Sequence, residues 1–343
     1  MPHTAVQSAP PAPPPHRAAA RHLRLSSVRF LPSSFRVLPS SVFLFPFAFC
    51  LLLAACTRVP PPPAIDGERA MKEVRELVAL GPRPSGGAGA EKAAAWIETK
   101  CRGLGYAPVT DSWTGRTPAG EKTFRNIEAV LPGAPGKGFI LVASHYDTKK
   151  IPEHPGFVGA NDSGSSTGLL LELMRVLKPA AGTPPAGPAL RFVFFDGEEC
   201  LDFYGPYDGL HGSRRLAETL EKSGAAKECR AMILLDMVGD RDLKLTLPGD
   251  TDPDLAARLF RAAERCGLRD RADFCAKYPS LLDDHVPFQE LGIPSIDLID
   301  FDYGPEMAWW HTAEDTPDKL SPESLRIAGT LAAALILDLA AQP

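Results

Sequence analysis

Acidic and histidine side chains recur in this sequence at the ends of short apolar runs and in the loops between them. The groups of this kind are His145, Asp147, Asp162, Glu198, Glu199, Asp236, Asp283, Asp284, His285 and His311. If the apolar runs are neighbouring strands, these side chains converge on one pocket. Carboxylates gathered in a pocket repel one another unless a cation offsets their charge. The pattern therefore predicts a metal site.

The mixture of side chains favours zinc as that metal. Zn²⁺ accepts imidazole nitrogen and carboxylate oxygen, and a catalytic zinc site keeps one position open beside three protein ligands. Glu198 and Glu199 are adjacent, so their side chains leave the backbone in different directions. One can hold the metal while the other faces the substrate as a general acid and base. An exposed acidic turn is the alternative, but the preceding run 191–195 is too apolar for a surface strand.

The elements that must position these residues alternate between strand and helix. Buried strands are predicted at 139–143, 191–195, 231–235 and 295–299. Helices are predicted from Asp66 to about 80 and at 90–102, 165–177, 211–222, 252–266 and 322–339. This alternation predicts an α/β fold in a single domain, with a mixed, mainly parallel central sheet and helices on both faces. Ligands bind at the carboxyl ends of the strands in such sheets, where the polar residues stand.

The first 56 residues are typical of a leader for export. They contain five arginines and no acidic residue, then an apolar stretch, 37–56, that ends in small residues. Its last four residues, Leu53-Ala54-Ala55-Cys56, resemble the lipobox of bacterial lipoproteins. This resemblance implies cleavage before Cys56, a lipid anchor on its thiol, and a periplasmic or cell-surface protein attached to the membrane. A plain signal peptide or a transmembrane anchor is the alternative. Residues 57–65 are a proline-rich tether, and 66–343 form the catalytic domain.

The net charge limits the partners of that domain. Without the five arginines of the leader, the formal net charge falls from -5 to -10. Because phosphate binding needs a basic surface, an acidic domain argues against nucleic acid as a partner.

Seven phrases of the sequence, in order along 69–339, carry a resemblance to a known family. They are SHYDTK (144–149), FVGANDSG (157–164), FFDGEE (194–199), LHGSRRLA (210–217), LLDMVG (234–239), DDHVPF (283–288) and the pair Trp310-His311. The chain resembles the zinc aminopeptidase superfamily and, within it, the glutaminyl-peptide cyclotransferases. Asp196, the doubled Asp283-Asp284 and Trp310 favour the cyclotransferases.

This resemblance implies an acyltransferase that converts N-terminal Gln of peptides or proteins to pyroglutamate and releases ammonia. One zinc ion would be held by Asp162, Glu199 and His311, and Glu198 would be the general acid and base. Asp236 and Asp283 would share a proton, because two close carboxyl groups do not both ionise comfortably. The wall that folds the substrate back on itself would include Trp310.

Two positions depart from the animal cyclases. Tyr204 stands where they have a tryptophan in the substrate wall, and Asp297 stands where they have a histidine in the hydrogen-bond network. Both residues are expected to contribute to substrate binding.

Two other functions stay open at this point. A two-zinc aminopeptidase would use the same residues, with His145 and Asp236 binding a second zinc ion and Asp162 bridging the pair. A non-catalytic binding lipoprotein would be expected to lack a ligand or the Glu198 base, and neither is missing.

Overall fold

The computed structural model describes residues 59–180, 182–183, 185–275 and 277–342. The leader 1–56 and the first two residues of the tether lie outside the described residues, so its export and lipid anchor stay predictions. Residues 59–65 form no helix or strand. None of the helices in the described part of the chain combines the length and apolar character needed to cross a bilayer.

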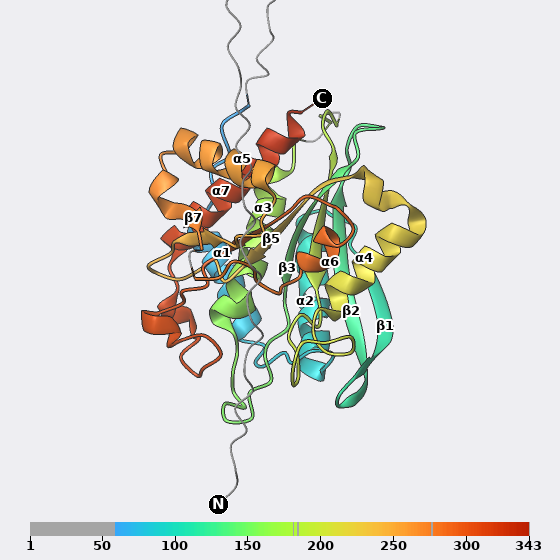
Figure 1. The fold of residues 1–343 in the computed structure, drawn as a ribbon, viewed down its shortest axis with the longest axis vertical. Helices are drawn as coiled ribbons and strands as arrows, with labels where there is room; N and C mark the ends of the chain where they lie inside the picture. The colour runs from blue at the N-terminus through green and yellow to red at the C-terminus, as the bar shows by residue number, and fades with distance from the viewer. Residues whose placement is uncertain (1–58, 181, 184, 276, 343) are drawn as a thin grey trace, which may run out of the picture. The chain divides into compact units, whose positions relative to one another are not determined.

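One mixed sheet of eight strands runs through the domain in the order β1-β2-β4-β3-β5-β8-β6-β7 (Figure 1). The central strands β4, β3, β5 and β8 are parallel, whereas β1, β2 and β4 pair antiparallel at one edge. In chain order the strands are Val109–Thr117, Gly120–Leu131, Phe139–His145, Ala189–Phe195, Cys229–Asp236, Leu245–Leu247, Ala272–Phe274 and Ser295–Ile299. The predicted mainly parallel centre is confirmed.

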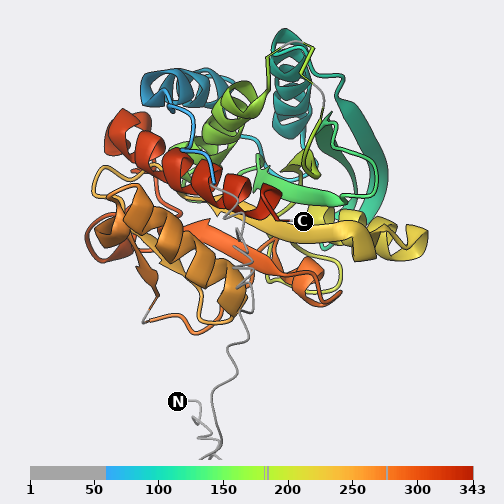
Figure 2. The same ribbon diagram turned by 90° about the horizontal axis from the view of Figure 1, so that it is seen from above.

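Helices cover both faces of this sheet, as predicted. The helices are α1 (Gly67–Val78), α2 (Ala88–Gly103), α3 (Ser166–Leu177), α4 (His211–Ser223), α5 (Pro253–Arg265), α6 (Val286–Gln289) and α7 (Pro322–Ala340). Helices α1, α3 and α7 lie side by side over one face (Figure 2). Helices α4 and α6 pack on the other face.

The core follows from side chains that alternate along apolar strands. On β3, Ile140 and Val142 face the larger helical layer, and Leu141 faces α4 and α6. Every residue of β3 is buried, because a central parallel strand is covered on both faces. This rigid centre ends at His145, where the site begins.

Candidate active site

The predicted site residues converge at the carboxyl ends of the parallel strands. His145 is the last residue of β3, Glu198 and Glu199 follow β4, and Asp236 ends β5. Asp162 comes from the short helical turn Ala160–Ser165 that leads into α3. All of these except His145 line a pocket of about 210 Å³, whose lining consists of Asp162, Glu198, Glu199, Tyr204, Asp236, Met237, Leu281, Leu282, Asp283, Ile299, Phe301, Trp310 and His311.

The three expected zinc ligands lie together on one side of this pocket. His311 Nε2 lies 3.1 Å from Asp162 Oδ2 and 3.1 Å from Glu199 Oε1. Donor atoms at this spacing can surround a single ion roughly 2 Å from each of them. Glu199 Oε2 accepts no hydrogen bond from the described residues. The positively charged side chain that pairs with it is Lys149, whose Nζ is 3.5 Å away. The three side chains offer one imidazole nitrogen and two carboxylates, and one oxygen of the Glu199 carboxylate is buried without a hydrogen bond. This donor set fits a zinc ion.

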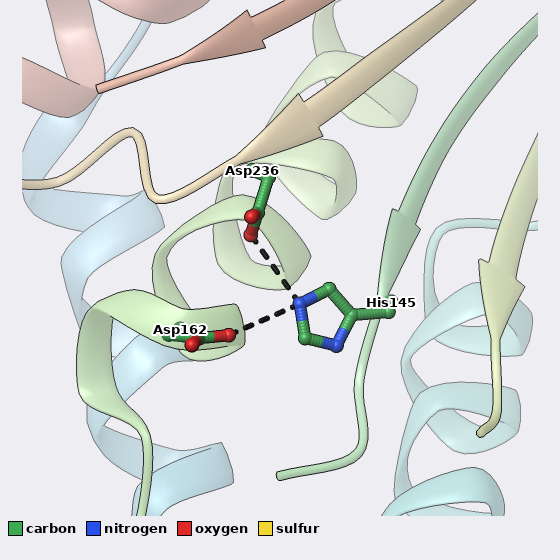
Figure 3. Close-up of side chains that lie close together, drawn as sticks. All are labelled: His145, Asp162 and Asp236. Atoms are coloured by element: carbon green, nitrogen blue, oxygen red, sulfur yellow. Dashed lines mark ion pairs between the residues drawn. The ribbon is translucent and has the colours of Figure 1, made fainter. Parts of the chain in front are cut away.

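A second set of donors shares Asp162 with the first. His145 Nε2 is 3.2 Å from Asp162 Oδ1 and 3.3 Å from Asp236 Oδ1, and Figure 3 shows the imidazole pointing between the two carboxylates. Burial alone would lower the pKa of His145, but Asp147, Asp162 and Asp236 raise it well above its usual value. All five ligands of the two-metal alternative are therefore present and close together.

Glu198 points into the pocket apart from both ligand sets. Its Oε1 accepts a hydrogen bond of 2.7 Å from the Tyr204 hydroxyl. Burial and the nearby carboxyl groups, Glu199 among them, raise the pKa of Glu198, while His145 opposes them. A raised pKa suits a group that must hold and return a proton. Tyr204, expected in the substrate wall, thus also contacts the expected acid and base.

Trp310 forms an aromatic wall beside the ligands. Its ring stacks on that of His311, with the centroids 4.1 Å apart and the planes inclined by 19°. Phe301, which sequence reasoning did not identify, lies 5.3 Å from Trp310, centroid to centroid, and lines the same pocket. His311 has a left-handed backbone with φ of 53°, a conformation that persists only when the surroundings fix it.

Two aspartates hold the loops that carry the expected ligands: Asp315, which sequence reasoning did not identify, and Asp147, which it grouped with the site but gave no role of its own. Asp315 accepts the backbone N–H groups of Asn161 and Asp162, at 2.7 and 3.2 Å, and the Tyr303 hydroxyl at 2.8 Å. Asp147 accepts the backbone N–H groups of Glu198 and Glu199, each at 3.2 Å. The only signal in the sequence was position, since Asp315 follows His311 closely and Asp147 follows His145.

Of the remaining predicted residues, some line the pocket and others are buried outside it. Burial and repulsion from neighbouring carboxyl groups raise the pKa of Asp236 and Asp283, which both line the pocket. No hydrogen bond between described residues joins this pair, so their shared proton stays a prediction. Asp196 accepts the backbone N–H groups of Gly86 and Arg125 and lies outside the pocket lining. Asp297 is buried in β8 close to Asp283, and it also lies outside the pocket lining.

Comparisons with known proteins agree with this geometry. The model of peptidase family M28 matches residues 126–336. The chain is 32% identical over 260 residues to the glutaminyl-peptide cyclotransferase-like protein of Bos taurus, covering 67% of this chain and 65% of that protein. It is 31% identical over 264 residues to the glutaminyl-peptide cyclotransferase of Boiga irregularis, covering 67% of this chain and 70% of that protein.

A solved structure extends the likeness to most of the chain. The glutaminyl cyclase of an Acidobacteriales bacterium has a TM-score of 0.75 and 36% identity, over 82% of this chain and 97% of that one. The chain spans about two thirds of the length of the curated relatives above. It therefore belongs to peptidase family M28 and, within that family, to the glutaminyl-peptide cyclotransferases.

Proposed function

We propose that this protein is a zinc-dependent glutaminyl-peptide cyclotransferase that acts on peptides or proteins with N-terminal Gln. The observation that carries the proposal is the match to cyclotransferases over most of the chain. The pocket supports it with a complete ligand set, Asp162, Glu199 and His311, and a separate carboxyl group on Glu198.

The reaction closes a ring within the substrate. The α-amine of the N-terminal Gln attacks its own γ-carbonyl carbon, a C–N bond forms, and the γ-amide nitrogen leaves as ammonia. When bound at Asp162, Glu199 and His311, zinc supplies a positive charge that stabilises the oxyanion developing on the γ-carbonyl oxygen. The protein's own side chains must supply the proton transfers and hold the substrate in a folded shape.

Glu198 performs the proton transfers in this scheme. It takes a proton from the attacking amine and returns it to the departing nitrogen, so no net proton is consumed. The hydrogen bond from Tyr204 fixes the position of the carboxyl group. Trp310 and Phe301 line the pocket beside it and favour the compact substrate conformer that the ring closure requires.

One observation favours a second candidate, a two-zinc aminopeptidase. His145, Asp162 and Asp236 could hold a second ion, which is the arrangement that hydrolysis of the N-terminal peptide bond would use.

A direct assay separates the two activities. The protein is incubated with a peptide that begins with Gln, and the products are analysed. Ammonia release with loss of the free amine supports the cyclotransferase, whereas release of free Gln would show hydrolysis.

We also propose that the protein is exported and anchored to the membrane through a lipid on Cys56. The apolar stretch 37–56 and its lipobox-like end support this proposal. In a bacterial host, the full chain is expected in the membrane fraction, and Cys56→Ala is expected to move it to the soluble fraction. Fractionation followed by mass spectrometry of the mature N-terminus tests this, and an unmodified Cys56 would contradict it.

A further inference from the structure

A fully buried carboxyl group lies on β8. Asp297 lies opposite Leu234 of β5, on the sheet face that α4 and α6 cover, and it is 0% exposed. Neither of its carboxyl oxygens accepts a hydrogen bond from any described residue. An acidic side chain at the centre of a buried sheet is costly unless something pairs with it.

An unpartnered histidine lies beside this carboxylate. His285 precedes α6, its side chain is 1% exposed, and neither ring nitrogen has a hydrogen-bond partner in the described part of the chain. Its Nδ1 is 4.0 Å from Asp297 Oδ2. Asp283 completes the group, because one donor atom from each of the three residues lies within 4.8 Å of the others.

The groups around Asp297 do not neutralise it. The charged side chains that act on it most strongly are all acidic, namely Asp236, Asp250, Asp283 and Asp284. Protonation of Asp297 would remove its charge, but its separation of 4.0 Å from His285 Nδ1 is too long for a hydrogen bond between the two side chains. A buried polar atom without a partner is destabilising. A cation between the three side chains would offset the charge and give one oxygen of Asp297 and one ring nitrogen of His285 a partner.

We propose that Asp283, His285 and Asp297 bind a divalent cation of the zinc type, separate from the ion at Asp162, Glu199 and His311. One imidazole and two carboxylates are the same donor set as in the pocket. Zinc holds such ligands at about 2.0–2.2 Å, so small side-chain rotations close the 4.0 Å separation of His285 and Asp297 around one ion.

The position of this cluster indicates a structural role. It joins β8 to the segment before α6, and both Asp297 and His285 are shielded from solvent. Asp283 belongs to the cluster and also lines the catalytic pocket. A cation here would therefore fix Asp283 against the sheet. The zinc contents expected below rest on the proposed function, in which the pocket holds one ion.

The test is the zinc content of the purified full chain, measured by elemental analysis. About two zinc ions per chain are expected for the wild type, and about one for either His311→Ala or Asp297→Asn. The double variant is expected to contain none. Asp250→Asn is the matched control, because Asp250 also acts on Asp297 but lies outside the cluster, and it should keep both ions.

Two results would overturn the inference. A single zinc ion that persists in Asp297→Asn would remove the second site and leave the cyclotransferase proposal intact. Two ions, of which one is lost in His145→Ala and none in Asp297→Asn, would place the second ion at His145, Asp162 and Asp236 and would count against the cyclotransferase as well. Anomalous scattering at the zinc edge from wild-type crystals decides the matter without any variant. A peak between Asp283, His285 and Asp297 supports the site, and its absence overturns it.

Discussion

Glu198 and Glu199 are neighbours in sequence with separate contacts in the pocket. Glu199 Oε1 faces His311 Nε2 at 3.1 Å, whereas Glu198 Oε1 faces the Tyr204 hydroxyl at 2.7 Å. The backbone N–H groups of both residues bind Asp147, which fixes the turn that separates the two side chains. One turn thus presents the proposed metal ligand and the proposed proton-transfer group to the same pocket.

Removal of the proton-accepting group should stop turnover without loss of the metal. Glu198→Gln keeps the size of the side chain, but an amide cannot accept and return the proton. We expect kcat with a Gln peptide to fall by at least about 100-fold while bound zinc is unchanged. Glu221→Gln on the exposed surface of α4 is the matched control. Full activity in Glu198→Gln would refute the assignment.

The hydrogen bond from Tyr204 should matter for kcat more than for substrate affinity. Tyr204→Phe keeps the ring but removes the hydroxyl that positions Glu198. Loss of a hydrogen bond to a carboxylate predicts a fall in kcat of roughly 10-fold with KM nearly constant. The nearby Tyr207 is 57% exposed, and Tyr207→Phe should behave as wild type. Equal kinetics of the two variants would mean that the Tyr204 hydroxyl does not act on the reaction.

Among the elements, the loops that carry ligands depend on side chains from distant segments. Asp315 accepts two N–H groups of the turn Ala160–Ser165, which presents Asp162 to the pocket. Its carboxyl group is buried, so its removal leaves those N–H groups unsatisfied.

Asp315→Ala should therefore loosen the turn and weaken the zinc site together. We expect the free energy of unfolding to fall by about 2 kcal/mol. Zinc affinity should fall about 10- to 100-fold, as for other residues that orient metal ligands. Urea denaturation and zinc titration measure the two effects. The exposed Asp318→Ala serves as the control. Unchanged zinc affinity in Asp315→Ala would show that the turn holds its shape without this carboxylate.

The sequence predicted the elements whose residues are buried on both faces. The runs 139–143, 191–195, 231–235 and 295–299 are apolar, and all four are strands of the parallel centre. The antiparallel hairpin of β1 and β2 was not predicted. Exposed and half-buried residues alternate along β1, and no apolar run marks the strand in the sequence. The convergence of Glu198, Glu199 and Asp236 was predictable from their places at strand ends, whereas the ligand set Asp162, Glu199 and His311 followed from the resemblance and stays a prediction. The roles of Asp147 and Asp315 were not, because hydrogen bonds to backbone groups leave no pattern of residue spacing.

On the scale of the whole molecule, buried carboxyl groups make stability depend on pH. Asp300 is 4% exposed, follows the end of β8, and accepts the backbone N–H of Lys244 at 2.8 Å. Burial raises its pKa to about 7. The folded state thus holds this proton more tightly than the unfolded state, so the contribution of Asp300 to stability falls as pH rises from about 4 to 7.

Asp300→Asn should reduce that pH dependence. The amide oxygen can still accept the Lys244 N–H, but the side chain no longer titrates. We expect the loss of unfolding free energy between pH 5 and pH 8 to be smaller in the variant than in the wild type. Urea denaturation at both pH values tests this, and an equal loss in the two proteins would contradict it.

Asp162 contacts both halves of the pocket, through Oδ1 to His145 and through Oδ2 to His311. This sharing has an evolutionary consequence. A substitution at His145 removes a donor from only one of the two sets, so the set Asp162, Glu199 and His311 stays complete. A substitution at Asp162 removes an oxygen donor from both sets at once, so neither set is complete in the resulting protein. We therefore expect related proteins to differ at His145 more often than at Asp162.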